Sequence, residues 1–134
     1  MRIKLWIGSA FVLGVVVGHM TVPTAHAQFR TVKTDRVLTT DLAGWCDGKE
    51  VTVELNDAGP GTSGKHYHPA HSFTYVLAGS EIYTLEGQGP KTVSAGNILH
   101  EAPMQVHTVD NASQVKLLVV RVIEKGKEAT VRQP

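Results

Sequence analysis

The feature that most constrains this chain is a group of three histidines that leads directly into an alternating, strand-like segment. The segment reads H-Y-H-P-A-H-S-F-T-Y-V-L-A-G from His66 to Gly79. Successive side chains of a strand point to opposite faces, so His66 and His68 are expected on one face and Tyr67 on the other. Neutral imidazole is the commonest metal ligand in proteins. Two such rings on one face of a strand therefore predict half of a metal site.

The remaining histidines lie close to this segment in the sequence. After residue 27 the chain has five, namely His66, His68, His71, His100 and His107. A single histidine is more often an ordinary core or surface residue than a ligand. The pair at 66 and 68 is different, because a further histidine, His107, follows a turn at Pro103. This combination predicts a third imidazole ligand at His107.

The first 27 residues have the pattern of an export signal. A short basic head, 1–4, precedes an apolar run, 5–17, and Ala25-His26-Ala27 forms a small-x-small cleavage sequence. The apolar run is shorter than the roughly 20 residues that cross a bilayer. We therefore expect a signal peptide over residues 1–27, a periplasmic or secreted protein, and no membrane association after cleavage. The alternative is an uncleaved N-terminal anchor.

The charge and cysteine content of the remaining chain argue against a nucleic-acid partner and against an internal disulfide. Removing Arg2 and Lys4 from the 13 basic residues leaves 11 against 12 acidic ones. No basic patch or run is present, so nucleic acid is not expected as a partner. The single cysteine, Cys46, cannot form an internal disulfide. We interpret it as a buried, inert residue, with a reactive thiol or an intermolecular disulfide as the alternative.

Hydrophobic alternation predicts an all-β protein with one domain. Strands are expected over 51–55, 72–77, 81–85, 91–93, 98–101, 106–109 and 114–123. Frequent turn residues between short strands are typical of a barrel or sandwich. The predicted organisation is an N-terminal arm or edge strand over 28–50, a barrel over 51–123, and a charged tail over 124–134 that frays.

Two segments of this chain resemble the two motifs of the cupin superfamily. Residues 61–79 resemble the first, in which a glycine precedes H-x-H and a second glycine marks a hairpin turn. Residues 96–111 resemble the second, through Gly96, Pro103, His107 and Asn111. The resemblance implies a single cupin (jelly-roll) antiparallel β-barrel. It also implies that His66, His68 and His107 are metal ligands.

The resemblance leaves the fourth ligand open. Ser72 stands where cupins usually carry a glutamate, and a serine hydroxyl is a poor ligand. His71 and Glu101 are the two candidates to replace it, and Glu101 is also the candidate catalytic base or orienting partner. Met104 stands in place of a turn glycine, which implies a different backbone geometry before His107. His100 is interpreted as a surface histidine.

The predicted function is an exported metal-binding cupin that acts on a small organic molecule. The expected cofactor is one divalent transition metal, Fe, Mn, Ni, Cu or Zn, because imidazole suits most of them. An enzyme of this type would be a small dioxygenase, another oxidoreductase, a lyase or an isomerase. The alternative is a non-catalytic metal- or ligand-binding protein, such as a sensor or stress protein. A small-molecule ligand is expected inside the barrel, and a homodimer is left open.

Overall fold

The computed structural model describes residues 27–134, and the predicted signal peptide lies outside them except for Ala27. Within the described residues the chain forms strands and no helices. In chain order the strands are β1 (Val32–Asp41), β2 (Lys49–Ala58), β3 (Gly61–Thr62), β4 (His66–Tyr67), β5 (His71–Ala78), β6 (Ser80–Leu85), β7 (Lys91–Ser94), β8 (Ile98–Glu101), β9 (His107–Asn111), β10 (Val115–Glu124) and β11 (Val131–Arg132). Among residues 27–134, no helix is long and apolar enough to cross a membrane.

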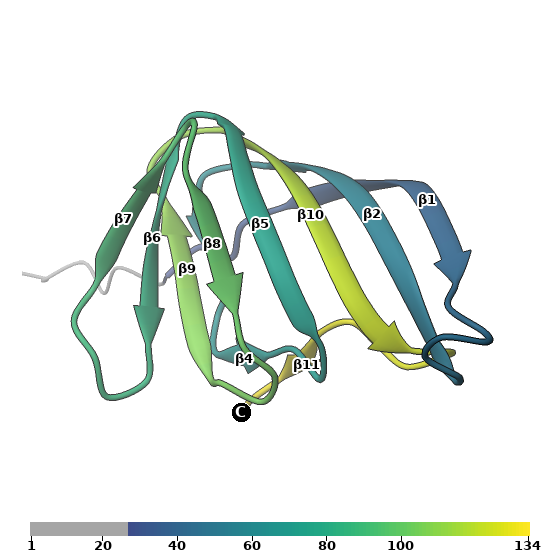
Figure 1. Cartoon of the computed structure of the whole chain (residues 1–134). Helices are drawn as coiled ribbons and strands as arrows, with labels where there is room; N and C mark the ends of the chain where they lie inside the picture. Colours follow the sequence, from purple (N-terminus) through teal and green to yellow (C-terminus); the bar gives the residue numbers. More distant parts are fainter. Residues whose placement is uncertain (1–26) are drawn as a thin grey trace, which may run out of the picture.

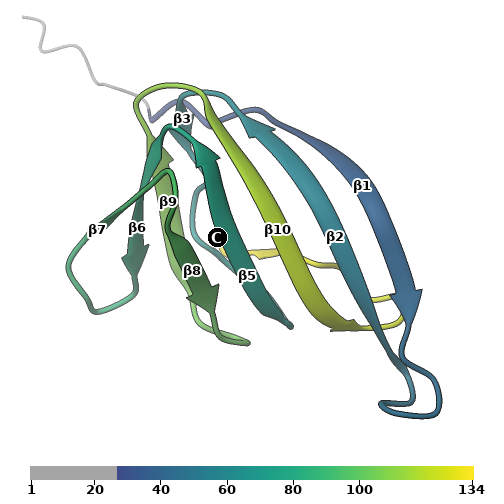
Figure 2. The same cartoon turned by 45° about the horizontal axis from the view of Figure 1, so that its top comes forward.

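The strands form two antiparallel sheets that face each other, as Figure 1 shows. One has the order β1-β2-β10-β5-β8, and the other has the order β11-β4-β9-β6-β7, with β3 paired to β9. Strands distant in sequence lie side by side in both sheets, which is the connectivity of a jelly roll. The all-β jelly-roll prediction is confirmed. The two sheets are not closed into a continuous barrel, and Figure 2 shows them as separate layers.

The space between the sheets is apolar at one end and polar at the other. Val76 of β5 pairs with Leu117 of β10, and both belong to a buried apolar cluster. Further along the same two strands, Ser72 pairs with Arg121, and both are also buried. The apolar end provides the hydrophobic core. The polar end leaves room for a functional site.

The outer face of the five-stranded sheet carries apolar side chains. The strand pairing places Leu55, Leu118, Tyr75 and Ile98 in one row across β2, β10, β5 and β8. Of these, Ile98 is 63% exposed. In β2 and β5 the alternating apolar residues therefore lie mainly on the outer face, because Thr52, Glu54, Ser72 and Thr74 are among the buried residues of these strands.

Turns between strands form at glycines in the sequence. Gly79, between β5 and β6, has a φ of 82°, and a Cβ added there would lie 2.8 Å from the carbonyl oxygen of Gln114. Only glycine fits this hairpin without displacing the backbone. In the loop between β1 and β2, Cys46 is partly buried.

Candidate metal centre

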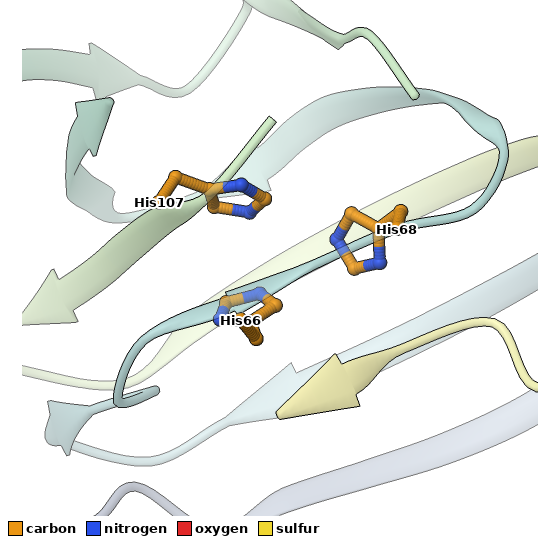
Figure 3. Close-up of side chains that lie close together, drawn as sticks. All are labelled: His66, His68 and His107. Atoms are coloured by element: carbon orange, nitrogen blue, oxygen red, sulfur yellow. The ribbon is translucent and has the colours of Figure 1, made fainter. Parts of the chain in front are cut away.

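Strand β4, the residue that follows it and strand β9 bring three histidine rings together between the sheets. His66 and His68 are both buried on the inner face, while Tyr67 between them is only partly buried. His66 on β4 is the direct strand partner of His107 on β9. A ring nitrogen from each of the three histidines lies within 4.8 Å of those of the other two. Figure 3 shows the three rings turned toward a common point.

A backbone carbonyl fixes the orientation of each ring. The Nδ1 atoms of His66, His68 and His107 lie 2.9, 2.7 and 2.8 Å from the carbonyl oxygens of Gly64, Ala129 and Gln105. Each carbonyl can only accept a hydrogen bond, so Nδ1 carries the proton and donates it. In the neutral ring this leaves Nε2 with a free lone pair. The three rings are therefore held in the tautomer that binds a metal through Nε2.

Burial keeps two of the rings uncharged. Desolvation lowers the pKa of His66 to about 4. It also lowers the pKa of His68, against the opposing effect of the Glu101 carboxylate. Both rings are consequently neutral near pH 7, which is the form that donates a lone pair to a metal.

Glu101 provides a carboxylate beside these rings. It lies on β8, and its two oxygens are 3.1 Å from Nε2 of His107 and 3.7 Å from Nε2 of His68. The hydroxyl of Thr74 donates a hydrogen bond of 3.3 Å to it. Burial opposes ionisation of Glu101, but the close contact with the His107 ring and the neighbouring positive charges outweigh burial and lower its pKa. The group is therefore an anion in a buried site.

The pairing of His107 with Glu101 requires a cation. Since Nδ1 of His107 donates to Gln105, Nε2 of the neutral ring is a buried acceptor with no hydrogen-bond partner. The nearest oxygen of Glu101 is also an acceptor. Burial disfavours a proton on His107, but the interaction with Glu101 prevails and raises its pKa, so a proton can bridge the two groups. A divalent cation held by the three rings, whose nitrogens lie within 4.8 Å of one another, would satisfy this Nε2 atom, with the Glu101 carboxylate beside His107 and His68, so these residues fit a metal ion.

The structure does not bring His71 to this cluster. His71 lies on β5, one residue before the buried Ser72, so its side chain is on the outer face and is exposed. Its Nδ1 is 3.0 Å from Nε2 of His100, which is exposed on the neighbouring strand β8. Of the two candidates for the fourth ligand, only Glu101 lies beside the three rings.

Buried ion pairs occupy the same interior. Arg121 donates hydrogen bonds to Ser72, at 3.1 Å, and to Glu54, which also accepts one of 2.9 Å from Arg36. This pair was not predicted from the sequence, although Arg121 is the only charged residue between Leu117 and Ile123. A charged residue inside the most apolar predicted strand was the feature that could have indicated a buried ion pair.

A second ion pair lies nearer to β6. Glu81 is buried and is 3.4 Å from Arg30, which also donates a hydrogen bond of 3.2 Å to Asn111. Burial raises the pKa of Glu81, although Arg30 opposes the shift. This pair was not predictable from local sequence patterns, because Arg30 and Glu81 are far apart in the chain.

The turn before His107 is left-handed despite having no glycine. Met104 has a φ of 65°, so the expectation of a different backbone geometry at this position was wrong. Its N–H donates a hydrogen bond of 2.8 Å to the carbonyl oxygen of His68. This bond connects the turn before one histidine to the backbone of another, and it stabilises a conformation that L residues rarely adopt.

The C-terminal segment does not fray as the sequence suggested. It turns back after β10 and forms β11, which pairs with β4 through Val131 with Tyr67 and Arg132 with His66. Figure 2 shows this yellow segment returning from the end of β10 toward the second sheet. Ala129, just before β11, provides the carbonyl that orients His68. The tail is therefore part of the site.

A cavity of about 360 Å³ opens beside the three rings. His66, His68 and Glu101 line it, together with polar, charged and apolar residues from both sheets and from the C-terminal segment. This volume is within the range of small-molecule sites, about 300–1,000 Å³. The arrangement can hold a metal ion at the wall of a cavity that admits a small organic molecule.

Comparison with known proteins agrees with this description. The family model for the cupin domain matches residues 53–121, just over half of the chain. No curated protein matches the chain significantly. Among solved structures, a cupin superfamily protein from Desulfitobacterium hafniense matches with a TM-score of 0.57 and 14% identity, over 74% of this chain and 84% of that one. A cupin-like protein from Thermotoga maritima matches with a TM-score of 0.57 and 14% identity, over 78% and 79%.

Two of the matching structures have an activity in their descriptions, and both are DMSP lyases. The DMSP lyase DddQ from Ruegeria pomeroyi matches with a TM-score of 0.55 and 19% identity, over 62% of this chain. The match covers only 43% of the lyase chain, so less than half of that protein has a counterpart here. At these identities the structural matches show a shared fold.

Proposed function

This chain belongs to the cupin domain family, and from that premise we propose that it binds one divalent transition-metal ion and uses it to transform a small organic molecule. The proposed ligands are His66, His68 and His107, with Glu101 as the fourth. The observation that carries the proposal is the buried Nε2 of His107, which has no hydrogen-bond donor and faces the Glu101 carboxylate. A bound divalent ion would supply Lewis-acid chemistry to an oxygen atom of the ligand.

Two of the three carboxyl groups that line the cavity are suited to different roles. The lowered pKa of Glu101 keeps it ionised, which suits a ligand or an orienting anion better than a base. Burial raises the pKa of Glu81, which also lines the cavity. A carboxyl with a raised pKa accepts and returns a proton more readily near neutral pH. We therefore assign proton transfer to Glu81 and revise the base role proposed for Glu101.

Catalysis is favoured over simple metal storage by the cavity. A purely structural metal site is closed by its ligands, whereas His66 and His68 line a space of about 360 Å³. The DMSP lyases among the structural matches make a lyase reaction the first to test, beside the oxygenase reaction expected from the sequence. A non-catalytic binding protein stays the alternative.

One experiment distinguishes these functions. The protein is purified, its metal content is measured, and it is incubated with a panel of small organic acids with and without oxygen. Turnover without oxygen supports a lyase, and oxygen uptake with turnover supports an oxygenase. A tightly bound metal without turnover in either arm supports the binding protein.

Export and dimerisation stay predictions. The basic head, apolar run and Ala25-His26-Ala27 support cleavage before Gln28, and the intact mass of periplasmic protein tests it. The apolar row formed by Leu55, Leu118, Tyr75 and Ile98 supports a homodimer that packs two five-stranded sheets face to face. Sedimentation velocity tests the dimer, and a monomer at all concentrations contradicts it.

A further inference from the structure

The charged side chains around the cavity are paired, with one exception. Three arginines and three glutamates line it, which gives a formal charge of zero when the histidines are neutral. Arg121 pairs with Glu54 and Arg30 pairs with Glu81, while Glu101 lies against the histidines. Among residues 27–134, Arg132 has no carboxylate within ion-pair distance. It is therefore the charge in the cavity wall that lacks a counter-charge.

Arg132 faces the cavity from the edge of the second sheet. Directly opposed residues of antiparallel strands have their side chains on the same face. Arg132 is opposite His66, whose ring points inward, so the arginine is also on the inner face. It is exposed, and it helps to line the cavity.

One hydrogen bond holds the guanidinium without neutralising it. Nη1 of Arg132 donates to the carbonyl oxygen of Ser63 at 2.7 Å. A guanidinium has five N–H donors in a planar fork, so donors remain for a second partner. A carboxylate matches this fork, because it can accept two parallel hydrogen bonds.

We propose that Arg132 anchors the carboxylate of a small organic acid that is the ligand of this cavity. The inference rests on the proposed metal function, since it assigns the substrate class of the same site. Adding a divalent ion to a cavity of zero formal charge gives a net charge of two positive units, which favours an anionic ligand. With its carboxylate at Arg132, the ligand extends into the cavity toward the rings of His66 and His68.

The test uses two probes of the same shape, propanoate and the neutral propanamide. Their binding to the metal-loaded protein is measured by calorimetric titration for wild type, Arg132→Gln and Arg132→Lys. Arg132→Gln removes a charge-assisted hydrogen bond to the carboxylate. Propanoate binding should therefore weaken about tenfold or more in this variant. Arg132→Lys keeps the charge and should retain part of the affinity. Propanamide binding should be equally weak in all three proteins.

A control on the same segment separates anchoring from a general effect of charge. Lys127→Gln removes a positive charge from an exposed residue that does not line this cavity, and it should leave propanoate affinity unchanged. Metal content is measured for every variant. Unchanged propanoate affinity in Arg132→Gln with full metal content overturns the proposal, and so does an equal loss in Lys127→Gln.

The metal function and the anchor can fail separately. If wild type holds no metal, the same titration is performed on the metal-free protein. Propanoate binding that still depends on Arg132 then supports the anchor and contradicts the metal function. Metal binding with propanoate affinity independent of Arg132 supports the metal function and contradicts the anchor.

Discussion

Ser72 and Glu101 are direct partners across the antiparallel pair of β5 and β8. Both side chains are buried on the inner face. Ser72 occupies the position where related proteins usually carry a glutamate, and the carboxylate here comes from the next strand. Opposed Cβ atoms in such a pair are about 4.5–5.5 Å apart, so either position can deliver a carboxylate to the same region.

This relationship predicts that the carboxylate can be exchanged between the two strands. Glu101→Ser should lower metal affinity, because the site loses its anion. Ser72→Glu alone should destabilise the metal-free protein, because a second carboxylate is buried beside the first. The double variant Ser72→Glu/Glu101→Ser should recover most of the affinity, as measured by calorimetric titration.

A neutral side chain provides the control for this exchange. Ser72→Gln/Glu101→Ser has nearly the same shape as the double variant but no carboxylate, and it should not recover affinity. Recovery in both double variants would show that side-chain volume, and not charge, determines binding at this position.

Metal binding should release protons in a pH-dependent manner. Glu101 raises the pKa of His107 above its ordinary value of about 6.5, while burial lowers those of His66 and His68. Near pH 6, therefore, His107 is the ring of the three that most favours a proton in the metal-free protein. Metal must displace this proton, so about one proton per ion should be released near pH 6, and fewer as the pH rises through the pKa of His107.

Calorimetry in buffers of different ionisation enthalpy measures this release. Glu101→Gln removes the anion that favours the protonated ring, so its release near pH 6 should be smaller. No proton release at pH 6 in wild type would contradict the assignment of a shared proton between His107 and Glu101.

The C-terminal segment should contribute to metal affinity without supplying a ligand. Deleting residues 129–134 removes the carbonyl of Ala129 that holds His68. Loss of such an orienting partner typically lowers metal affinity about 10–100-fold. Deleting only Gln133 and Pro134 retains both Ala129 and β11, and it should have little effect. Equal affinities for the two truncated proteins would show that the segment does not orient His68.

Much of the fold was predictable because local patterns determine it. The alternation through Ser72, Thr74 and Val76 fixed which side chains share a face, and Gly79 marked a hairpin that requires a left-handed residue. The tail was not predictable in this way. Its only apolar residue after Ile123, apart from Ala129, is Val131, and its pairing with β4 depends on contacts between distant parts of the chain.

Part of the site was likewise visible in the sequence. The spacing of His66 and His68 is a local property of a strand, whereas the choice between His71 and Glu101 depended on the register between β5 and β8. The ion pair of Glu54 and Arg121 was missed for another reason. Alternation in 51–55 shows two faces but not which one is buried, and here the face with Thr52 and Glu54 points inward.

The metal content of five single variants tests the central claim most directly. Each protein is loaded with a divalent metal and dialysed, and its metal content per chain is then measured by elemental mass spectrometry. We predict about one ion per chain in wild type, His71→Ala and His100→Ala, and a sharp loss in His66→Ala, His68→Ala and His107→Ala, because two imidazoles do not complete a site. Full occupancy in the three triad variants, or an equal loss in His71→Ala and His100→Ala, would contradict a metal centre built on His66, His68 and His107.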